Sequence, residues 1–144
     1  MEQTQQGSHE QLQGRGQNQT GERLLLRGAA VVGLGGVALI HLLDLQAKLE
    51  EVPYLGYLYI ALIVASLWAA AALIRSDSRL AWWVGGAASL ATIIGYALTR
   101  SVGLPSATDD IGNWLEPLGL ASLFVEAWTV IVVCWALWVP PRKG

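Results

Sequence analysis

Glu126 is the residue whose type and position most clearly suggest chemistry. It is the single charged residue in an apolar run from Leu118 to Val139. A carboxyl group roughly 12 Å from the end of such a helix is costly to bury and marks a functional site by default. Gly119, Ser122 and Thr129 fall on the same helical face. Two interpretations are open: a ligand for a proton or cation, and a carboxyl group that hydrogen-bonds across a helix bundle and stabilises it.

His41 is the second candidate, near the end of a first apolar run. Asp44 and Lys48 follow it on the same helical face, and an imidazole beside a carboxylate can titrate near neutral pH. A metal or haem site lacks its other ligands, because Cys134 belongs to the far end of the fourth run and His9 to an N-terminal tail. We therefore predict no metal and no cofactor. His41 is either an interfacial side chain satisfied by a neighbour or part of a functional polar site.

Arg100 is the third candidate and lies at the end of the third apolar run. It is either an anchor whose charge reaches the membrane surface or a partner for Glu126 or an anionic ligand. Tyrosines of the second and third runs fall at a similar depth. The sequence thus predicts an outward-facing polar pocket lined by His41, Asp44, Tyr59, Tyr96, Arg100 and Glu126.

Four apolar runs must position these side chains: 24–43, 54–74, 80–99 and 118–139. Each has about 20 residues, which is enough for a helix to cross ~30 Å of hydrocarbon. Backbone groups in lipid must pair within their own segment, so helices are expected. The composition agrees, since 14% of the residues are charged against about 25% in soluble domains. We predict an all-α fold, a polytopic bundle of four transmembrane helices.

Several residues mark the expected helix ends. Pro53 and Pro117 suit first turns, where the missing N–H costs little. A polar turn at 75–79 offers a Ser or Asp N-cap, and Gly103 with Pro105 ends the third helix. Residues 45–51 are either an amphipathic continuation of the first helix or a charged loop.

Aromatic residues and glycines add two expectations. A set of aromatic residues near the ends of the runs predicts interfacial belts: Trp82, Trp83, Trp114, Trp135, Trp138, Tyr54 and Tyr57. The stretch GLGGVA at 33–38 matches a dinucleotide-binding pattern but lies within an apolar run with no preceding strand. Close helix packing explains it better.

The flanks and charges predict the topology. Residues 1–22 are rich in Gln and Gly and predict a disordered tail, 23–139 form the membrane domain, and 140–144 form a second tail. Seven of the nine basic residues share the side that holds both tails, so both termini are predicted to be cytoplasmic: Arg15, Arg23, Arg27, Arg75, Arg79, Arg142 and Lys143. The net charge of −2 argues against a nucleic-acid partner.

Three segments resemble small, poorly characterised four-helix membrane proteins common in actinobacteria. They are residues 40–65, TRSVGLP at Thr99–Pro105, and LFVEAW at Leu123–Trp128. The resemblance implies the four-helix fold and a bacterial plasma membrane, and it brings no established activity. The glycine-rich first helix is also similar in style to DoxX-like proteins, which have redox associations.

These features favour a non-enzymatic accessory, sensing or partner-binding subunit. Its expected partners are the lipid bilayer and either a larger membrane protein or further copies of itself as a homo-oligomer. One alternative is a small oligomeric proton-coupled transporter that uses Glu126. The other is a membrane redox-associated protein.

Overall fold

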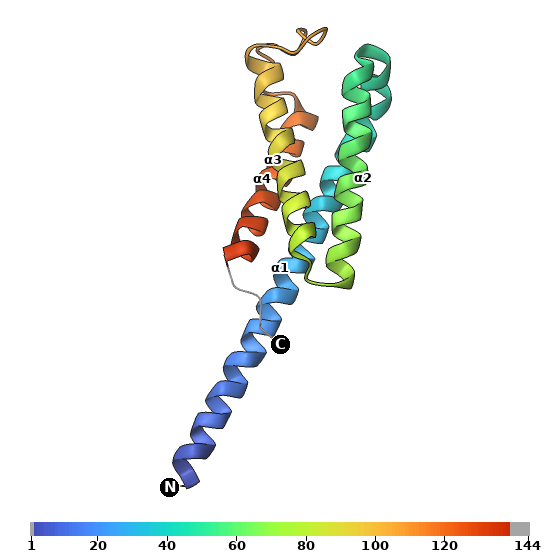
Figure 1. Ribbon diagram of the computed structural model, residues 1–144. Helices are drawn as coiled ribbons and strands as arrows, with labels where there is room; N and C mark the ends of the chain where they lie inside the picture. The colour runs from blue at the N-terminus through green and yellow to red at the C-terminus, as the bar shows by residue number, and fades with distance from the viewer. Residues whose placement is uncertain (1, 139–144) are drawn as a thin grey trace.

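The computed structural model describes the backbone of residues 2–138 and the side chains of residues 19–138. The described residues form four helices: α1 (Glu2–Glu51), α2 (Pro53–Arg75), α3 (Arg79–Ser101) and α4 (Pro117–Trp138) (Figure 1). A single isolated bridge, between Leu104 and Ala107, lies in the segment that joins α3 to α4. The predicted all-α fold is confirmed.

Each helix contains a segment long and apolar enough to cross a membrane: Gln19–Glu51, Pro53–Arg75, Arg79–Ser101 and Pro117–Trp138. The helices alternate in direction, so the bundle has two distinct ends (Figure 1). One end holds the α2–α3 turn and the end of α4, and we call it the basic end because Arg23, Arg27, Arg75 and Arg79 lie there. The other, the loop end, holds the α1–α2 connection and residues 102–116.

The helix boundaries follow the predicted signals. Pro53 lies in the first turn of α2, and Pro117 begins α4. Ser78 is the N-cap of α3, where its hydroxyl accepts a hydrogen bond from the Ala81 N–H at 3.4 Å. Gly103 follows the last turn of α3 with φ of +78° and donates its N–H to the Leu98 carbonyl at 2.9 Å. Glycine suits that left-handed position because it has no Cβ.

Helix α1 extends beyond its predicted span at both ends. It continues through residues 45–51, which confirms the helical interpretation of that stretch. At its other end, the backbone of residues 2–22 projects away from the bundle (Figure 1). The disorder expected for residues 1–22 stays a prediction. Residues 139–144, the expected end of the fourth span and the C-terminal tail, lie outside the described residues.

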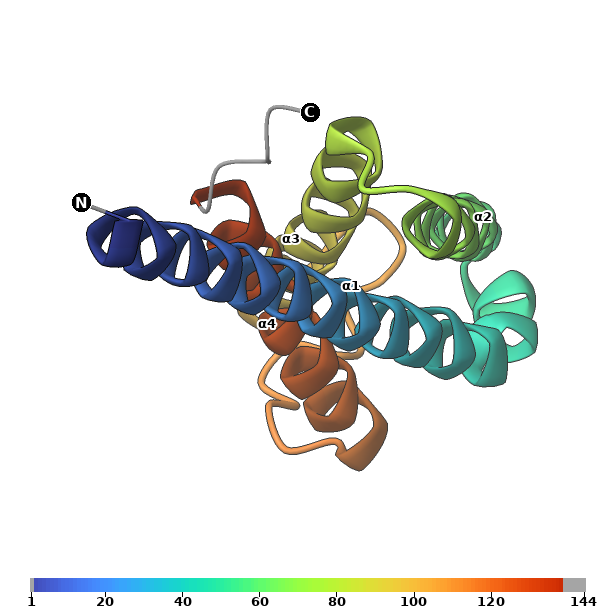
Figure 2. The same ribbon diagram turned by 90° about the horizontal axis from the view of Figure 1, so that it is seen from below.

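The helices pack as a ring in which α1 contacts α2 and α4, and α3 contacts the same two helices (Figure 2). Glycines of the 33–38 stretch allow α1 to approach α4. A Cβ added to Gly33 would overlap the Thr129 hydroxyl, and one added to Gly36 would lie 2.9 Å from Val125 Cγ1. The structure confirms close helix packing as the role of this stretch.

The hydrophobic core closes the bundle toward the basic end. Its largest members are Leu34, Leu73 and Trp82, which are almost fully buried. The belt prediction is wrong for Trp82, because its ring packs inside the bundle while its indole N–H donates to Asp77 at 2.6 Å. The other six aromatic residues of that set are exposed, from 39% for Tyr54 to 87% for Trp138.

Candidate ligand cavity

A cavity of about 580 Å³ occupies the loop end of the bundle. This volume falls within the range of small-molecule sites. All four helices and the 102–116 segment contribute to its wall. The wall includes every residue of the predicted pocket: His41, Asp44, Tyr59, Tyr96, Arg100 and Glu126.

Helical spacing explains why these side chains meet. On α4, Gly119, Ser122 and Glu126 line the cavity at intervals of three and four residues. On α1, His41 and Asp44 do so at an interval of three. The face of α4 predicted around Glu126 is therefore the face that borders the cavity.

Glu126 lies deepest in the polar part of the wall and is completely buried. Its Oε1 accepts a hydrogen bond from the Ser122 hydroxyl at 2.7 Å and lies 3.7 Å from His41 Nε2. Its Oε2 has no hydrogen-bond partner among the described residues. A buried carboxyl oxygen without a donor is unfavourable, so a hydrogen-bond donor of a bound molecule would be stabilised at this atom.

His41 is oriented by the backbone of its own helix. Its Nδ1 lies 2.9 Å from the Val37 carbonyl oxygen, which can only accept, so Nδ1 carries the hydrogen. Nε2 is thereby directed at Glu126. The Tyr59 ring meets the imidazole edge-on, with the ring centroids 4.7 Å apart. His41 and Glu126 are thus held side by side at the inner end of the cavity.

Asp44 extends the polar wall toward the loop end. Its Oδ2 accepts a hydrogen bond from the Tyr59 hydroxyl at 3.3 Å. Within residues 19–138, no Lys or Arg nitrogen lies close enough to Asp44 to form an ion pair. Glu126, His41, Tyr59 and Asp44 therefore form one continuous row.

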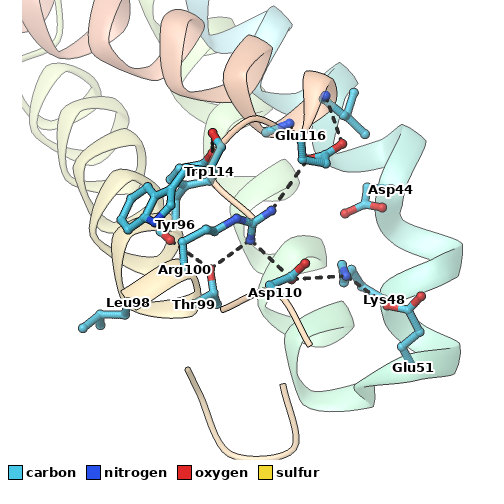
Figure 3. Close-up of polar contacts among 12 residues, drawn as sticks. Asp44, Lys48, Glu51, Tyr96, Leu98, Thr99, Arg100, Asp110, Trp114 and Glu116 are labelled. Carbon is cyan, nitrogen blue, oxygen red and sulfur yellow. Dashed lines mark hydrogen bonds and ion pairs between the residues drawn. The ribbon is translucent and has the colours of Figure 1, made fainter. Parts of the chain in front are cut away.

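Arg100 organises a second group of charges on the opposite part of the wall (Figure 3). Its Nη1 lies 3.3 Å from Asp110 Oδ2, and its Nη2 lies 3.6 Å from Glu116 Oε2. Its guanidinium carbon lies 4.4 Å from the centre of the Tyr96 ring, a cation–π contact. No ion pair joins Arg100 to Glu126 in the described part of the chain, so, of the alternatives considered for Arg100, the structure does not support a pairing with Glu126.

The positions of Asp110 and Glu116 explain why Arg100 does not pair with Glu126. Glu116 immediately precedes α4, whereas Glu126 lies about 14 Å further along that helix by its rise per residue. Asp110 and Glu116 reach the guanidinium from the 102–116 segment before Glu126 can. Lys48 also faces Asp110, at 3.9 Å, and donates to Glu51 at 2.9 Å.

The 102–116 segment is fixed over the cavity by several hydrogen bonds. Glu116 accepts from the N–H groups of Leu118 and Gly119 at 3.0 and 2.7 Å, and so caps α4. The Tyr96 hydroxyl donates to the Trp114 carbonyl at 2.9 Å, as Figure 3 shows. These contacts hold the two acids of the segment beside Arg100.

Lys48, Asp110 and Glu116 line the cavity but were not among the predicted pocket residues. Asp110 lies in a segment without periodicity, which gives no indication of the direction of its side chain. A signal existed for Glu116, because it directly precedes Pro117 at the predicted start of the fourth helix, where an acidic side chain interacts favourably with the helix N-terminus.

The remaining wall is apolar and belongs mainly to α2 and α3. Leu58, Leu62 and Ala65 on α2 face the cavity, as do Ala88 and Ala91 on α3. A wall of this kind with a few convergent polar groups is typical of sites for small organic molecules. Within residues 19–138, no group of three or more His, Cys, Asp or Glu side chains is placed to hold a metal ion.

Comparisons of this chain with protein-family models, with curated proteins and with solved structures give no match.

Proposed function

We propose that this chain is an integral protein of a bacterial plasma membrane, with both termini in the cytoplasm and the cavity facing outward. In this proposal it acts as a non-enzymatic sensing or partner-binding subunit that responds to a small amphipathic molecule in the cavity. The observation that carries the proposal is the cavity itself, which joins a polar row on α1 and α4 to an apolar wall on α2 and α3.

The outer surface of the bundle supports membrane insertion. Large apolar side chains such as Leu43, Val64, Ile74 and Phe124 are more than 60% exposed. Water would solvate such a surface poorly, whereas hydrocarbon would solvate it well. The arginines at the basic end support a cytoplasmic position for that end.

A screen for thermal stabilisation in detergent tests the binding function. We expect some amphipathic molecules to raise the unfolding temperature of the wild-type protein. We expect the Gly95→Leu variant to lose this response, because Gly95 lines the cavity and a Cβ there meets no atom within 4 Å. The new side chain would fill the cavity without a backbone clash.

Gly35→Leu is the matched control. Gly35 is also helical and half-buried, and a Cβ there also meets no atom within 4 Å, but it does not line the cavity. A response that survives in Gly95→Leu, or the absence of any response in the wild type, would contradict binding in the cavity.

A proton-coupled transporter is the second candidate, and the His41–Glu126 contact favours it. When His41 Nδ1 carries a hydrogen, the contact of 3.7 Å between His41 Nε2 and Glu126 Oε1 is favourable if one further proton lies on either of these two atoms. Such a pair can release that proton when a solute binds. Proton uptake driven by a solute gradient in proteoliposomes would support transport if Glu126→Gln abolished it, and no flux with the wild type would contradict it.

A further inference from the structure

The charges around the cavity are not balanced by the protein. Four carboxyl groups line it, those of Asp44, Asp110, Glu116 and Glu126, against the two permanent cations Lys48 and Arg100. Both cations face Asp110, and Arg100 also pairs with Glu116. The carboxyl groups of Asp44 and Glu126 are thus the two that form no ion pair with a described Lys or Arg, and the charge of Lys48 acts on Asp44 only at longer range.

Glu126 gives the sharper indication of what the cavity would bind. Its side chain is 1% exposed, and its Oε2 has no donor among the described residues. His41 and Ser122 both approach the other oxygen, Oε1. A donor N–H located in the cavity would satisfy Oε2, and a positively charged donor would also offset the charge of the carboxylate.

The row from Glu126 to Asp44 defines where such a cation would lie. His41 and Tyr59 stand between the two carboxyl groups, and the Tyr59 hydroxyl already donates to Asp44. Asp44 retains capacity for further donors, because an ionised carboxyl group can accept about four hydrogen bonds. An ammonium group at Glu126 Oε2 would therefore also be attracted by the charge of Asp44 further along the row.

Arg100 does not provide an equivalent place for an anion. Its Nε lacks a hydrogen-bond partner, but the rest of the guanidinium faces Asp110 and Glu116. The carboxylates of Asp110 and Glu116, which already contact this guanidinium, would repel an anion bound to it. The charge distribution therefore selects a cation over an anion.

The apolar wall indicates the chemical character of the rest of the bound molecule. Helices α2 and α3 diverge from their connecting turn toward the loop end (Figure 1), and their small side chains, such as Ala65, Ala88 and Ala91, leave space there. Alkyl or aryl groups would occupy this space favourably.

We propose that the cavity takes an amphipathic organic amine, with its ammonium group toward Asp44 and Glu126 and its apolar body between α2 and α3. This inference rests on the proposed function, because it names the chemical class of the molecule that the cavity binds.

Three probes of equal length test it: octylammonium, octanol and octanoate. Binding is measured by equilibrium dialysis of the full-length protein in nanodiscs of zwitterionic lipid, with empty nanodiscs as the background. We expect saturable binding of octylammonium at least tenfold tighter than that of the other two. Glu126→Gln and Asp44→Asn should each weaken octylammonium binding at least tenfold, and Gly95→Leu should abolish it.

Asp109→Asn is the matched control, since Asp109 is an exposed acid next to Asp110 that does not line the cavity. It should bind octylammonium like the wild type. If octanol or octanoate binds best and Gly95→Leu abolishes that binding, the cation preference is overturned while the proposed function stands. If Gly95→Leu abolishes the binding of none of the three probes, or if no probe binds, both the cation preference and the proposed function are overturned. Unchanged binding by folded Glu126→Gln and Asp44→Asn would also overturn the assignment of the ammonium site.

Discussion

The charged side chains around the cavity divide into a group joined by ion pairs with Lys or Arg and a group that has no such pair. Arg100 belongs to the first, because it pairs with Asp110 and Glu116, although its Nε is buried without a partner among the described residues. Glu126 belongs to the second, and its Oε2 is buried without a donor. The first group stabilises the loop end, and the second is available to a ligand.

Arg100→Met tests the stabilising group. Methionine preserves most of the length of the side chain but has no charge, so Asp110 and Glu116 lose their main cation. Both acids are partly exposed, so screening limits the loss. We expect the free energy of unfolding in mixed micelles to fall by about 1–3 kcal/mol.

Arg79→Met is the control for this measurement. Arg79 is exposed in the first turn of α3, so its replacement should change the free energy of unfolding by less than about 0.5 kcal/mol. Equal effects of the two substitutions would contradict a specific role for the Arg100 contacts.

The helices are positioned by glycines where they approach most closely. Gly33 and Gly36 on α1 lie against Thr129 and Val125 on α4. On α3, a Cβ added to Gly86 would lie 2.7 Å from Val133 Cγ1. These contacts hold α4 against α1 and α3, and so fix the depth at which Glu126 lies. Helix packing through small residues is a general solution where lipid surrounds the bundle.

Gly33→Leu should separate α1 from α4. The new side chain would overlap Thr129, and overpacking of this kind costs about 1–3 kcal/mol. Thermal unfolding in detergent measures the effect. Gly35→Leu, two residues away with open space at its Cβ, should unfold near the wild-type temperature. A Gly33→Leu variant as stable as Gly35→Leu would contradict close packing at this position.

The sequence predicted the helices well because local signals set their ends. Pro53, Ser78 and Pro117 act on the backbone beside them, so their effects can be inferred without knowledge of the fold. Helical periodicity also grouped the polar residues of α1 and α4 on the faces that line the cavity.

The partners of Arg100 and the burial of Trp82 could not be inferred in the same way. Residues 102–116 have no period that assigns Asp110 to a face, so its pairing with Arg100 depends on the path of the loop. Trp82 and Trp83 are adjacent and chemically identical, yet the first is buried and the second is exposed. The rotation of α3 within the bundle decides between them, and that rotation is a tertiary property.

The bundle as a unit is asymmetric along its axis. The basic end is closed by packed apolar side chains, including Leu34, Leu73 and Trp82. The loop end contains the cavity, which is lined by the buried polar residues His41, Thr99, Ser122 and Glu126. Passage of a molecule from the cavity to the basic end would therefore require this core to open.

The central claim is that the four helices cross a membrane with the cavity end outward. Single-cysteine variants made on a Cys134→Ser background test it, with a membrane-impermeant maleimide and right-side-out vesicles from a bacterial host. Asn113 and Ser76 are suitable sites, because both are exposed and lie at opposite ends of the bundle. The account predicts that Asn113→Cys is labelled in intact vesicles and that Ser76→Cys is labelled after permeabilisation alone. Labelling of both sites in intact vesicles, or the reverse pattern, would contradict it.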